Sequence, residues 1–337
     1  MTVYFDKANL EVFAGRKSEA MYPDCLRMVQ RDLDKTFNFS KDELKANANL
    51  LAWFQLHMAG NIGKTTITYA DPVFPVRPLK SNTPNTFNAT QLASVYLLDD
   101  ERMDAFKGTS AVLAGKPGEC IETLTPLFLG NGDYKFERKY RISDKANVGA
   151  TTPPATFCEW AQLKEVATPI TDILIVDRFI AHDVSLLPAN LEALIAGLGC
   201  HSRTAVNVVI YTDSSKLKAD YTALRARVRA AIQRATGKQG TFTLVSVTTI
   251  KGLKSFGEHD RTILTNYFRV YSGDSFNYWL SNGTKTTTGR EISFSSLADE
   301  TNRLLAKQLV ADLQANLDQL SDRSIEGDKK SGFFTFK

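Results

Sequence analysis

The chain has 337 residues, of which 43% are hydrophobic and 23% charged, with 41 lysines and arginines against 37 aspartates and glutamates. This composition excludes disorder over the whole chain, the small net charge of +4 does not by itself indicate an acidic partner, and the length favours two globular units. Since the first ten residues are too polar for a signal peptide, and no uncharged apolar run approaches the roughly 20 residues of a membrane-spanning helix, we expect neither export nor a transmembrane segment.

Two helices are predicted early in the chain. Apolar residues recur at helical spacing over residues 22–37, and Ser40 followed by Glu43 has the pattern of a capping box that opens a second helix. Acidic residues at 99–104 could bind a metal ion, but they also suit the first turn of a helix, which we consider the simpler interpretation.

Strand signals also occur in this half. Residues 65–69 are β-branched and predict a short strand, and Asn131-Gly132 lies between two apolar arms in residues 127–136, as in a β-hairpin. Residues 1–150 are therefore expected to form a mixed α+β domain, whose role the sequence does not indicate.

Pro153 and Pro154 interrupt the chain near its middle. They predict a boundary, formed either by a linker or by an ordered loop, between that domain and a second one at 166–337.

In the second half of the chain, strand-like and helix-like sequence patterns alternate. Short continuous apolar runs are separated by amphipathic stretches, which predicts a mostly parallel sheet covered by helices. The predicted strands are 173–176, 206–211 and 242–247, and the predicted helices are 187–198 and 221–236.

Two more strands and a long helix are predicted after this unit. The strands are 262–264 and 268–271, and the helix is 296–320. A stripe of leucines is expected to form its buried face: Leu297, Leu304, Leu305, Leu309 and Leu313.

The four cysteines, Cys25, Cys120, Cys158 and Cys200, lie far apart and form no C-x-x-C pair. This spacing fits buried apolar residues in a reducing compartment better than disulfides or a zinc site. We therefore expect a cytoplasmic protein.

The residues with the clearest chemistry are His259 and Arg261. If their segment is extended, both side chains lie on one face and Asp260 on the other. An imidazole beside a guanidinium is a plausible phosphate site, because arginine offers a planar fork of donors and histidine can donate a proton or attack.

This segment resembles the phospholipase D superfamily, whose signature reads H-x-K, four residues, D, six residues, G-S-x-x-N. His259, Gly273 and Asn277 match that signature with unchanged spacing. The resemblance covers roughly residues 170–320. The chain departs from the signature at three positions: Arg261 for lysine, Asn266 for aspartate, and Asp274 for serine.

The resemblance implies phosphodiester chemistry without a metal or another cofactor. In this family two copies of the motif meet; one histidine attacks phosphorus and the other protonates the leaving group. Since this chain holds one copy, the resemblance implies a homodimer in which two His259 side chains face each other.

The substitutions favour phosphate binding without turnover. Arg261 keeps a positive charge, but Asn266 removes a carboxylate that would help to activate His259. The resemblance places His259, Arg261 and Asn277 at catalytic positions, and places four residues around the phosphate: Asn266, Gly273, Asp274 and Ser275.

A basic segment at 216–254 precedes the motif, and Asp220 is its only acid. A basic helix face of this kind is either simply solvated or contacts a polyanion, of which nucleic acid and anionic lipid are the two candidates. The predicted nucleic-acid contacts are Lys218, Arg225, Arg229, Lys251 and Lys254.

The sequence as a whole predicts an α/β protein with an N-terminal mixed α+β domain and a C-terminal phospholipase D-like domain. The expected function is binding of nucleic acid or another phosphodiester. One alternative is a nuclease or phosphodiesterase that acts through a phosphohistidine at His259, and another is a lipid-binding or scaffold protein.

Overall fold

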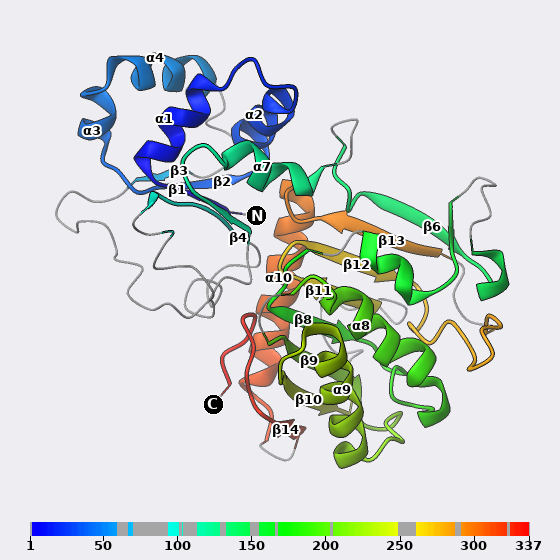
Figure 1. The fold of residues 1–337 in the computed structure, drawn as a ribbon. Coiled ribbons are helices and arrows are strands. Elements are labelled where there is room, and N and C mark those ends of the chain that lie inside the picture. The colour runs from blue at the N-terminus through cyan, green and yellow to red at the C-terminus, as the bar shows by residue number, and fades with distance from the viewer. Residues whose placement is uncertain are drawn as a thin grey trace.

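Two sheets organise the chain in the computed structural model (Figure 1). Within the described residues, one sheet has five strands and the other has nine. The chain is therefore an α/β protein. The structure describes residues 2–58, 67–69, 94–100, 103, 113–128, 133–148, 155–165, 168–202, 205–248, 261–286, 291–321 and 324–336.

The first sheet has the strand order β3-β2-β1-β4-β5, and every neighbouring pair is parallel. A parallel sheet needs crossover connections, so the N-terminal part is α/β and not the α+β domain that the sequence predicted. Its strands are β1 (Thr2–Phe5), β2 (Asp34–Phe37), β3 (Ile67–Tyr69), β4 (Ser94–Leu97) and β5 (Leu113–Gly115). Its helices are α1 (Lys7–Gly15), α2 (Tyr22–Arg31), α3 (Lys41–Lys45), α4 (Ala48–His57), α7 (Cys120–Leu124) and the 3₁₀ turn η1 (Thr125–Leu127).

The early helix predictions are confirmed in part. The helix predicted over 22–37 ends at Arg31, because the residues that follow it form β2 and pair with β1. The capping box is confirmed: the Glu43 N–H donates to Ser40 Oγ at 3.1 Å, and the Ser40 N–H donates to Glu43 Oε2 at 2.8 Å.

The predicted short strand and hairpin also have counterparts. The strand is β3, although residues 65 and 66 lie outside the described residues. The two hairpin arms meet in an antiparallel bridge between Phe128 and Tyr134. The turn at Asn131-Gly132 lies outside the described residues as well.

The second sheet has the strand order β14-β10-β9-β8-β11-β12-β13-β6-β7. Only β10-β9, β9-β8 and β6-β7 pair in parallel, so the sheet is mixed and the prediction of a mostly parallel sheet is wrong. Its strands are β6 (Arg138–Ile142), β7 (Thr156–Phe157), β8 (Asp172–Val176), β9 (Asn207–Asp213), β10 (Thr241–Val247), β11 (Arg261–Thr265), β12 (Phe268–Ser272), β13 (Glu291–Ser296) and β14 (Ile325–Gly327).

The two sheets do not follow the predicted division of the chain. Strands β6 and β7 belong to the second sheet, although β6 lies inside the range 1–150 and β7 precedes residue 166. The predicted boundary at Pro153 and Pro154 lies outside the described residues.

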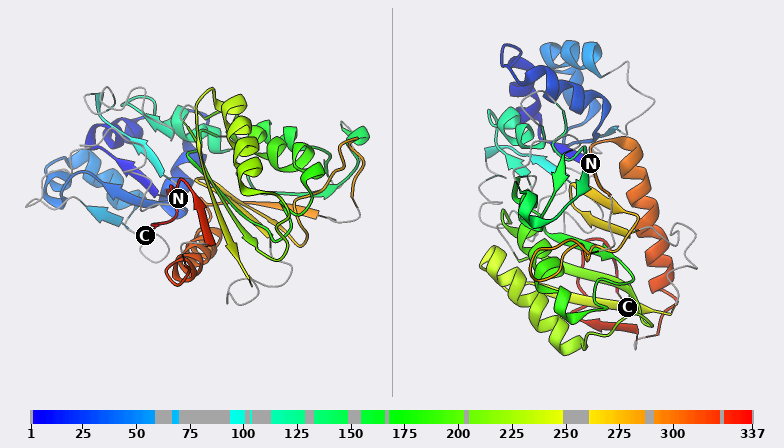
Figure 2. Two further views of the ribbon diagram at one scale, coloured as in Figure 1. Left: turned by 90° about the horizontal axis from the view of Figure 1, so that it is seen from below. Right: turned by 90° about the vertical axis from the view of Figure 1, so that its right-hand side faces the viewer.

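Helices cover both faces of the second sheet. Helices α8 and α9 lie on one face and α10 lies on the other (Figure 2). Within the described residues, no helix is both long and apolar enough to cross a bilayer. The helices are α8 (Ala193–Gly199), α9 (Tyr221–Thr236) and α10 (Glu300–Leu317), with the short turns η2 (Lys145–Asn147), η3 (Trp160–Glu165), η4 (Val184–Leu186) and the π-helical η5 (Pro188–Glu192).

The helix predictions in this half differ in accuracy. Helix α9 has the predicted bounds, and the stretch predicted over 187–198 is divided between η5 and α8. Helix α10 begins at Glu300, because the residues up to Ser296 belong to β13.

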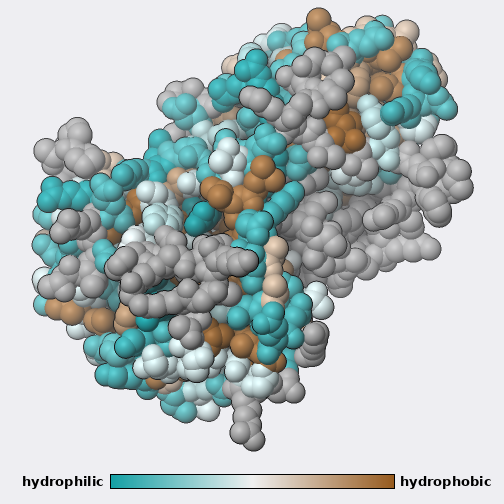
Figure 3. All heavy atoms as spheres, turned by 180° about the vertical axis from the view of Figure 1, so that it is seen from behind, coloured by the Kyte–Doolittle hydropathy of each residue, from teal (hydrophilic) through white to brown (hydrophobic). Residues whose placement is uncertain are grey.

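The expected leucine stripe on α10 is wrong at two positions. Leu304 and Leu305 are 56% and 52% exposed. The helix is turned so that a different set of its residues faces the core. Exposed hydrophobic residues are not unusual in this protein, since they are scattered among hydrophilic ones on the face seen in Figure 3. The buried residues of α10 are Arg303, Ala306, Leu309, Leu313 and Leu317.

Side chains join the two sheets into one body. The Arg303 guanidinium donates to the Asp32 carbonyl at 2.7 Å and pairs with the Asp34 carboxylate at 3.2 Å. The Leu113 N–H donates to the Tyr267 hydroxyl at 2.9 Å. The hydrophobic core is accordingly continuous between the two parts.

The cysteine prediction holds for three of the four residues. Cys25, Cys120 and Cys158 are buried free thiols, whereas Cys200 is partly exposed. Burial raises the pKa of Cys25 to about 12, which keeps this thiol protonated and unreactive.

Candidate phosphate site

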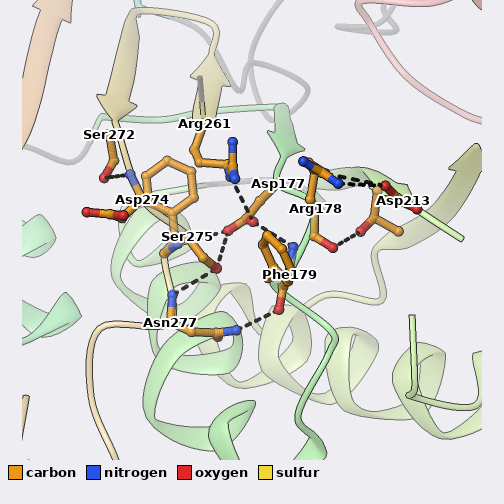
Figure 4. Close-up of polar contacts among 11 residues, drawn as sticks. Asp177, Arg178, Phe179, Asp213, Arg261, Ser272, Asp274, Ser275 and Asn277 are labelled. Carbon is orange, nitrogen blue, oxygen red and sulfur yellow. Dashed lines mark hydrogen bonds and ion pairs between the residues drawn. The ribbon is translucent and has the colours of Figure 1, made fainter. Parts of the chain in front are cut away.

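The strand directions bring several loops to one edge of the second sheet (Figure 4). The carboxyl ends of the parallel strands β8 and β9 lie there. Because β11 runs antiparallel to β8, it begins at this edge, and its first residue, Arg261, pairs with Ser272 at the end of β12. Polar residues from four strand ends therefore meet at what we call the carboxyl edge.

Asp177 follows β8 and lies at the centre of this edge. Its carboxylate is fully buried and accepts three hydrogen bonds of 2.8 Å, from the Phe179 N–H, the Phe276 N–H and the Ser275 hydroxyl. One side chain thus ties the loop after β8 to the loop after β12.

The Arg261 guanidinium lies beside this carboxylate. Its residue is 4% exposed, and its Nε lies 3.6 Å from Asp177 Oδ1. Burial raises the pKa of Asp177, and its backbone and hydroxyl donors together with the Arg261 guanidinium oppose that rise. The site therefore contains a buried acid with a guanidinium beside it.

Three cationic side chains lie within about 6 Å of the centroid of the Phe179 ring. The guanidinium carbons of Arg178 and Arg261 lie 5.5 and 5.8 Å from the ring centroid, and Lys216 Nζ lies 6.0 Å from it. An aromatic face attracts cations at such distances. The ring therefore helps to hold three positive charges from three different segments.

A second ion pair lies beside the first. The Arg178 guanidinium approaches Asp213 Oδ2 at 3.2 Å, at the carboxyl end of β9. Burial alone would raise the pKa of Asp213, but the hydroxyl and N–H of Ser215 together with Arg178 hold it below its usual value. Asp213 is therefore ionised and fixes Arg178.

The predicted residues after β12 lie at this edge. The Asn277 amide donates to the Phe179 carbonyl at 2.7 Å, and the Asp274 N–H donates to Ser272 Oγ at 3.2 Å. Together with Ser275 and Gly273, they form the loop that Asp177 holds. The structure thus brings together Arg261, Gly273, Asp274, Ser275 and Asn277, and the Asn277 amide braces the loop of Phe179.

Asn266 is not at this edge, contrary to the prediction that it contacts phosphate. It follows β11, whose five residues span roughly 16 Å. Its Oδ1 accepts from the N–H groups of Thr171 and Asp172 at 2.8 and 3.1 Å, and it is 1% exposed. Asn266 therefore braces the opposite edge, which we call the amino edge.

Three of the predicted residues lie outside the described residues. They are His259, Lys251 and Lys254. The predicted nucleophile and two of the predicted nucleic-acid contacts therefore stay predictions.

The arginines of α9 are not free to point outward as expected. Arg229 and Arg225 pair with Asp328 at 2.7 and 3.2 Å. Asp328 also accepts from the Phe242 N–H, near the amino end of β10. These arginines are therefore held toward the amino edge and are partly neutralised.

An acid from elsewhere in the chain pairs with two further arginines of α9. Arg227 and Arg234 both pair with Glu192 at 2.8 Å, so Asp220 is not the only acid near this helix in space. Lys218 is exposed, and its N–H lies 3.4 Å from the Ala181 carbonyl, in the loop after β8. The structure describes three of the predicted nucleic-acid contacts, and Lys218 is the one that lies on the loops of the carboxyl edge.

Sequence reasoning missed the centre of the site. Asp177, Phe179 and Lys216 were not predicted, although Asp177 ends the first apolar run of this half. The signal that could have found them is the position of polar residues directly after parallel strands, where ligand sites of α/β proteins gather.

Comparisons with known proteins identify no family for this chain. No model of a protein family matches it, and no curated protein matches it. The resemblance to the phospholipase D superfamily rests on the spacing from His259 to Asn277 and stays a prediction.

Proposed function

We propose that the carboxyl edge binds phosphate groups of a nucleic acid or a similar polyanion without cleaving it. The observation that carries this proposal is the convergence of Arg178, Lys216 and Arg261 on the ring of Phe179. Guanidinium and ammonium groups are the usual ligands of phosphate oxygens.

Of the three cations beside the Phe179 ring, two are held by carboxylates. Arg178 and Arg261 each lie beside a buried carboxylate. Within the described residues Lys216 has no carboxylate partner, and its side chain is partly exposed. An incoming phosphate would therefore meet the Lys216 ammonium first and the two fixed guanidinium groups behind it.

The contacts favour binding over turnover. The Asn277 amide is engaged by the Phe179 carbonyl, and Arg261 lies against Asp177. His182 is near the ring, but its Nδ1 lies 2.8 Å from the Lys216 carbonyl oxygen and bonds to it. These groups are committed to holding the loops, which is the role of a binding site and not of a nucleophile.

The test is the salt dependence of binding. Fluorescence anisotropy with labelled single-stranded and duplex DNA and with RNA, in EDTA at several salt concentrations, compares wild type with Lys216→Gln. We expect weaker binding and a slope of log affinity against log salt that is smaller by about 0.7 to 0.9. Unchanged affinity and slope in Lys216→Gln would contradict the proposal.

A matched control lies on the same half of the chain. Lys238 is exposed and precedes β10, so it lies toward the amino edge. Lys238→Gln removes the same charge, and we expect it to leave both affinity and slope close to wild type. Anionic liposomes form a further arm; binding to liposomes but not to oligonucleotides would indicate a lipid ligand.

The nuclease alternative is tested in the same assay. Cleavage of an oligonucleotide in EDTA by wild type, but not by His259→Ala, would show that the site turns over. Since the phospholipase D-like mechanism needs two copies of the motif, it also predicts a dimer in light scattering.

A further inference from the structure

The backbone of Phe179 is fixed at both of its polar groups, the N–H and the carbonyl. Its N–H donates to Asp177 at 2.8 Å, and its carbonyl accepts from the Asn277 amide at 2.7 Å. Asp177 is fully buried and Asn277 is 7% exposed. The backbone from which the ring projects is therefore held by two buried side chains.

The ring itself does not fill the core. Val176 and Ile180, on either side of this loop, are fully buried, whereas Phe179 is partly exposed. A large apolar side chain held rigidly at the surface is a common feature of binding sites, since it offers contact area at a low entropic cost.

The three cations near the ring differ in mobility. Arg178 and Arg261 are each held by a carboxylate, at 3.2 and 3.6 Å. Lys216, at 6.0 Å from the ring centroid, has a flexible side chain and no carboxylate partner within the described residues. Its ammonium can therefore leave the ring for a nearby phosphate without breaking an ion pair.

We propose that Phe179 stacks on an unpaired base, so that the site selects single-stranded nucleic acid; this rests on the proposed function. Single-strand recognition combines two elements. Cations bind the nucleic-acid backbone, and an aromatic ring beside them stacks on a base. Bases inside a duplex are stacked on each other and cannot reach such a ring. Phe179 then determines specificity, while Lys216 contributes affinity for any phosphate chain.

The test separates the base from the backbone. An oligo-dT and an abasic strand of the same length carry equal phosphate charge, and only the first can stack. We expect wild type to prefer oligo-dT, and Phe179→Leu to weaken its binding by about 5- to 150-fold, as the loss of one stacked base predicts. Binding of the abasic strand should stay within about twofold of wild type.

Two further variants keep the test decisive. Tyr271→Leu removes a 37%-exposed aromatic ring on β12 and should not change either affinity. Phe179→Trp keeps an aromatic face, so it should retain or increase the preference for oligo-dT even if the leucine variant does not fold.

The outcomes distinguish the two proposals. Equal binding of oligo-dT and the abasic strand by wild type, or equal losses for both strands in a folded Phe179→Leu variant, would overturn base stacking. A Lys216→Gln variant with unchanged binding of both strands would instead contradict the phosphate site itself.

Discussion

Strand β8 has a buried aspartate at each end, and the two differ in their surroundings. Asp177 at the carboxyl edge lies beside the Arg261 guanidinium and accepts three hydrogen bonds. Asp172 at the amino edge accepts from Asn207 and from the Gly332 N–H, and within the described residues no cation pairs with it. Among the described residues, no hydrogen-bond donor reaches its Oδ2.

The difference shows that the direction of the strands gives the two edges of this sheet different surroundings. At the carboxyl edge, loops from several strands meet and bring cations with them, and this is where we propose that phosphate binds. At the amino edge, the C-terminal segment closes over Asp172, with Phe333 and Phe334 buried beside it. Burial raises the pKa of Asp172, which favours a neutral carboxyl group at this edge.

The largest effect is expected at the carboxyl edge. Asp177→Ala leaves three donors unsatisfied and the Arg261 guanidinium buried without this carboxylate. We expect the free energy of unfolding to fall by about 3–5 kcal/mol. Urea denaturation measures it, with the exposed Glu165→Ala as control. A loss no larger than that of the control would contradict the central role of Asp177.

The next effect tests the position of Asn266. Asn266→Ala removes the acceptor to which the N–H groups of Thr171 and Asp172 donate, so we expect a loss of about 1–3 kcal/mol of unfolding free energy. Oligonucleotide affinity should not change, because the residue lies at the amino edge. If a folded variant bound oligonucleotides more weakly, Asn266 would contribute to the phosphate site after all. The exposed Gln319→Ala serves as control.

A comparable loss is expected where the C-terminal segment meets Asp172. A Cβ at residue 332 would lie 2.7 Å from Asp172 Oδ2, so Gly332→Ala must displace one of the two. We expect a cost of about 1–3 kcal/mol and faster hydrogen exchange in residues 328–336. Gly15→Ala meets no atom within 4 Å and is the matched control. Unchanged exchange would show that this contact does not hold the segment.

The smallest change in unfolding free energy is expected for Asp172→Asn, and this change depends on pH. A carboxyl group whose pKa is raised on folding stabilises the protein fully below its unfolded value, near 3.9, and this contribution is lost as the pH rises through the folded value. The variant should match wild type near pH 4 and lose less stability above it. The difference grows by at most about 1.4 kcal/mol per pH unit. Parallel pH profiles of unfolding would show that Asp172 does not titrate.

Local patterns predicted local structure well. Helix α9 and the capping box at Ser40 follow from side-chain spacing within one segment, and the structure has both. The strand partners could not be predicted in this way. Strand β6 pairs with β13 about 150 residues later, and no local pattern indicates such a pairing.

The grouping of the candidate residues could be predicted where it depends on one segment. Arg261 and the residues from Gly273 to Asn277 come together because β11 and β12 pair as neighbours. Asn266 was misplaced because motif spacing does not show that the two ends of β11 lie at opposite edges. Asp177, Phe179 and Lys216 were missed because their closeness depends on loops from separate strands.

The early place of β6 in the chain has a consequence for synthesis on the ribosome. The strands of the first sheet all lie within residues 2–115, so that sheet can assemble while the rest is being translated. Strand β6 follows after α7 and η1, but its partner β13 emerges only at Glu291–Ser296. During that interval β6 has an open edge, and three of its five residues are Arg138, Lys139 and Arg141. Such charges discourage pairing with another nascent chain before β13 arrives.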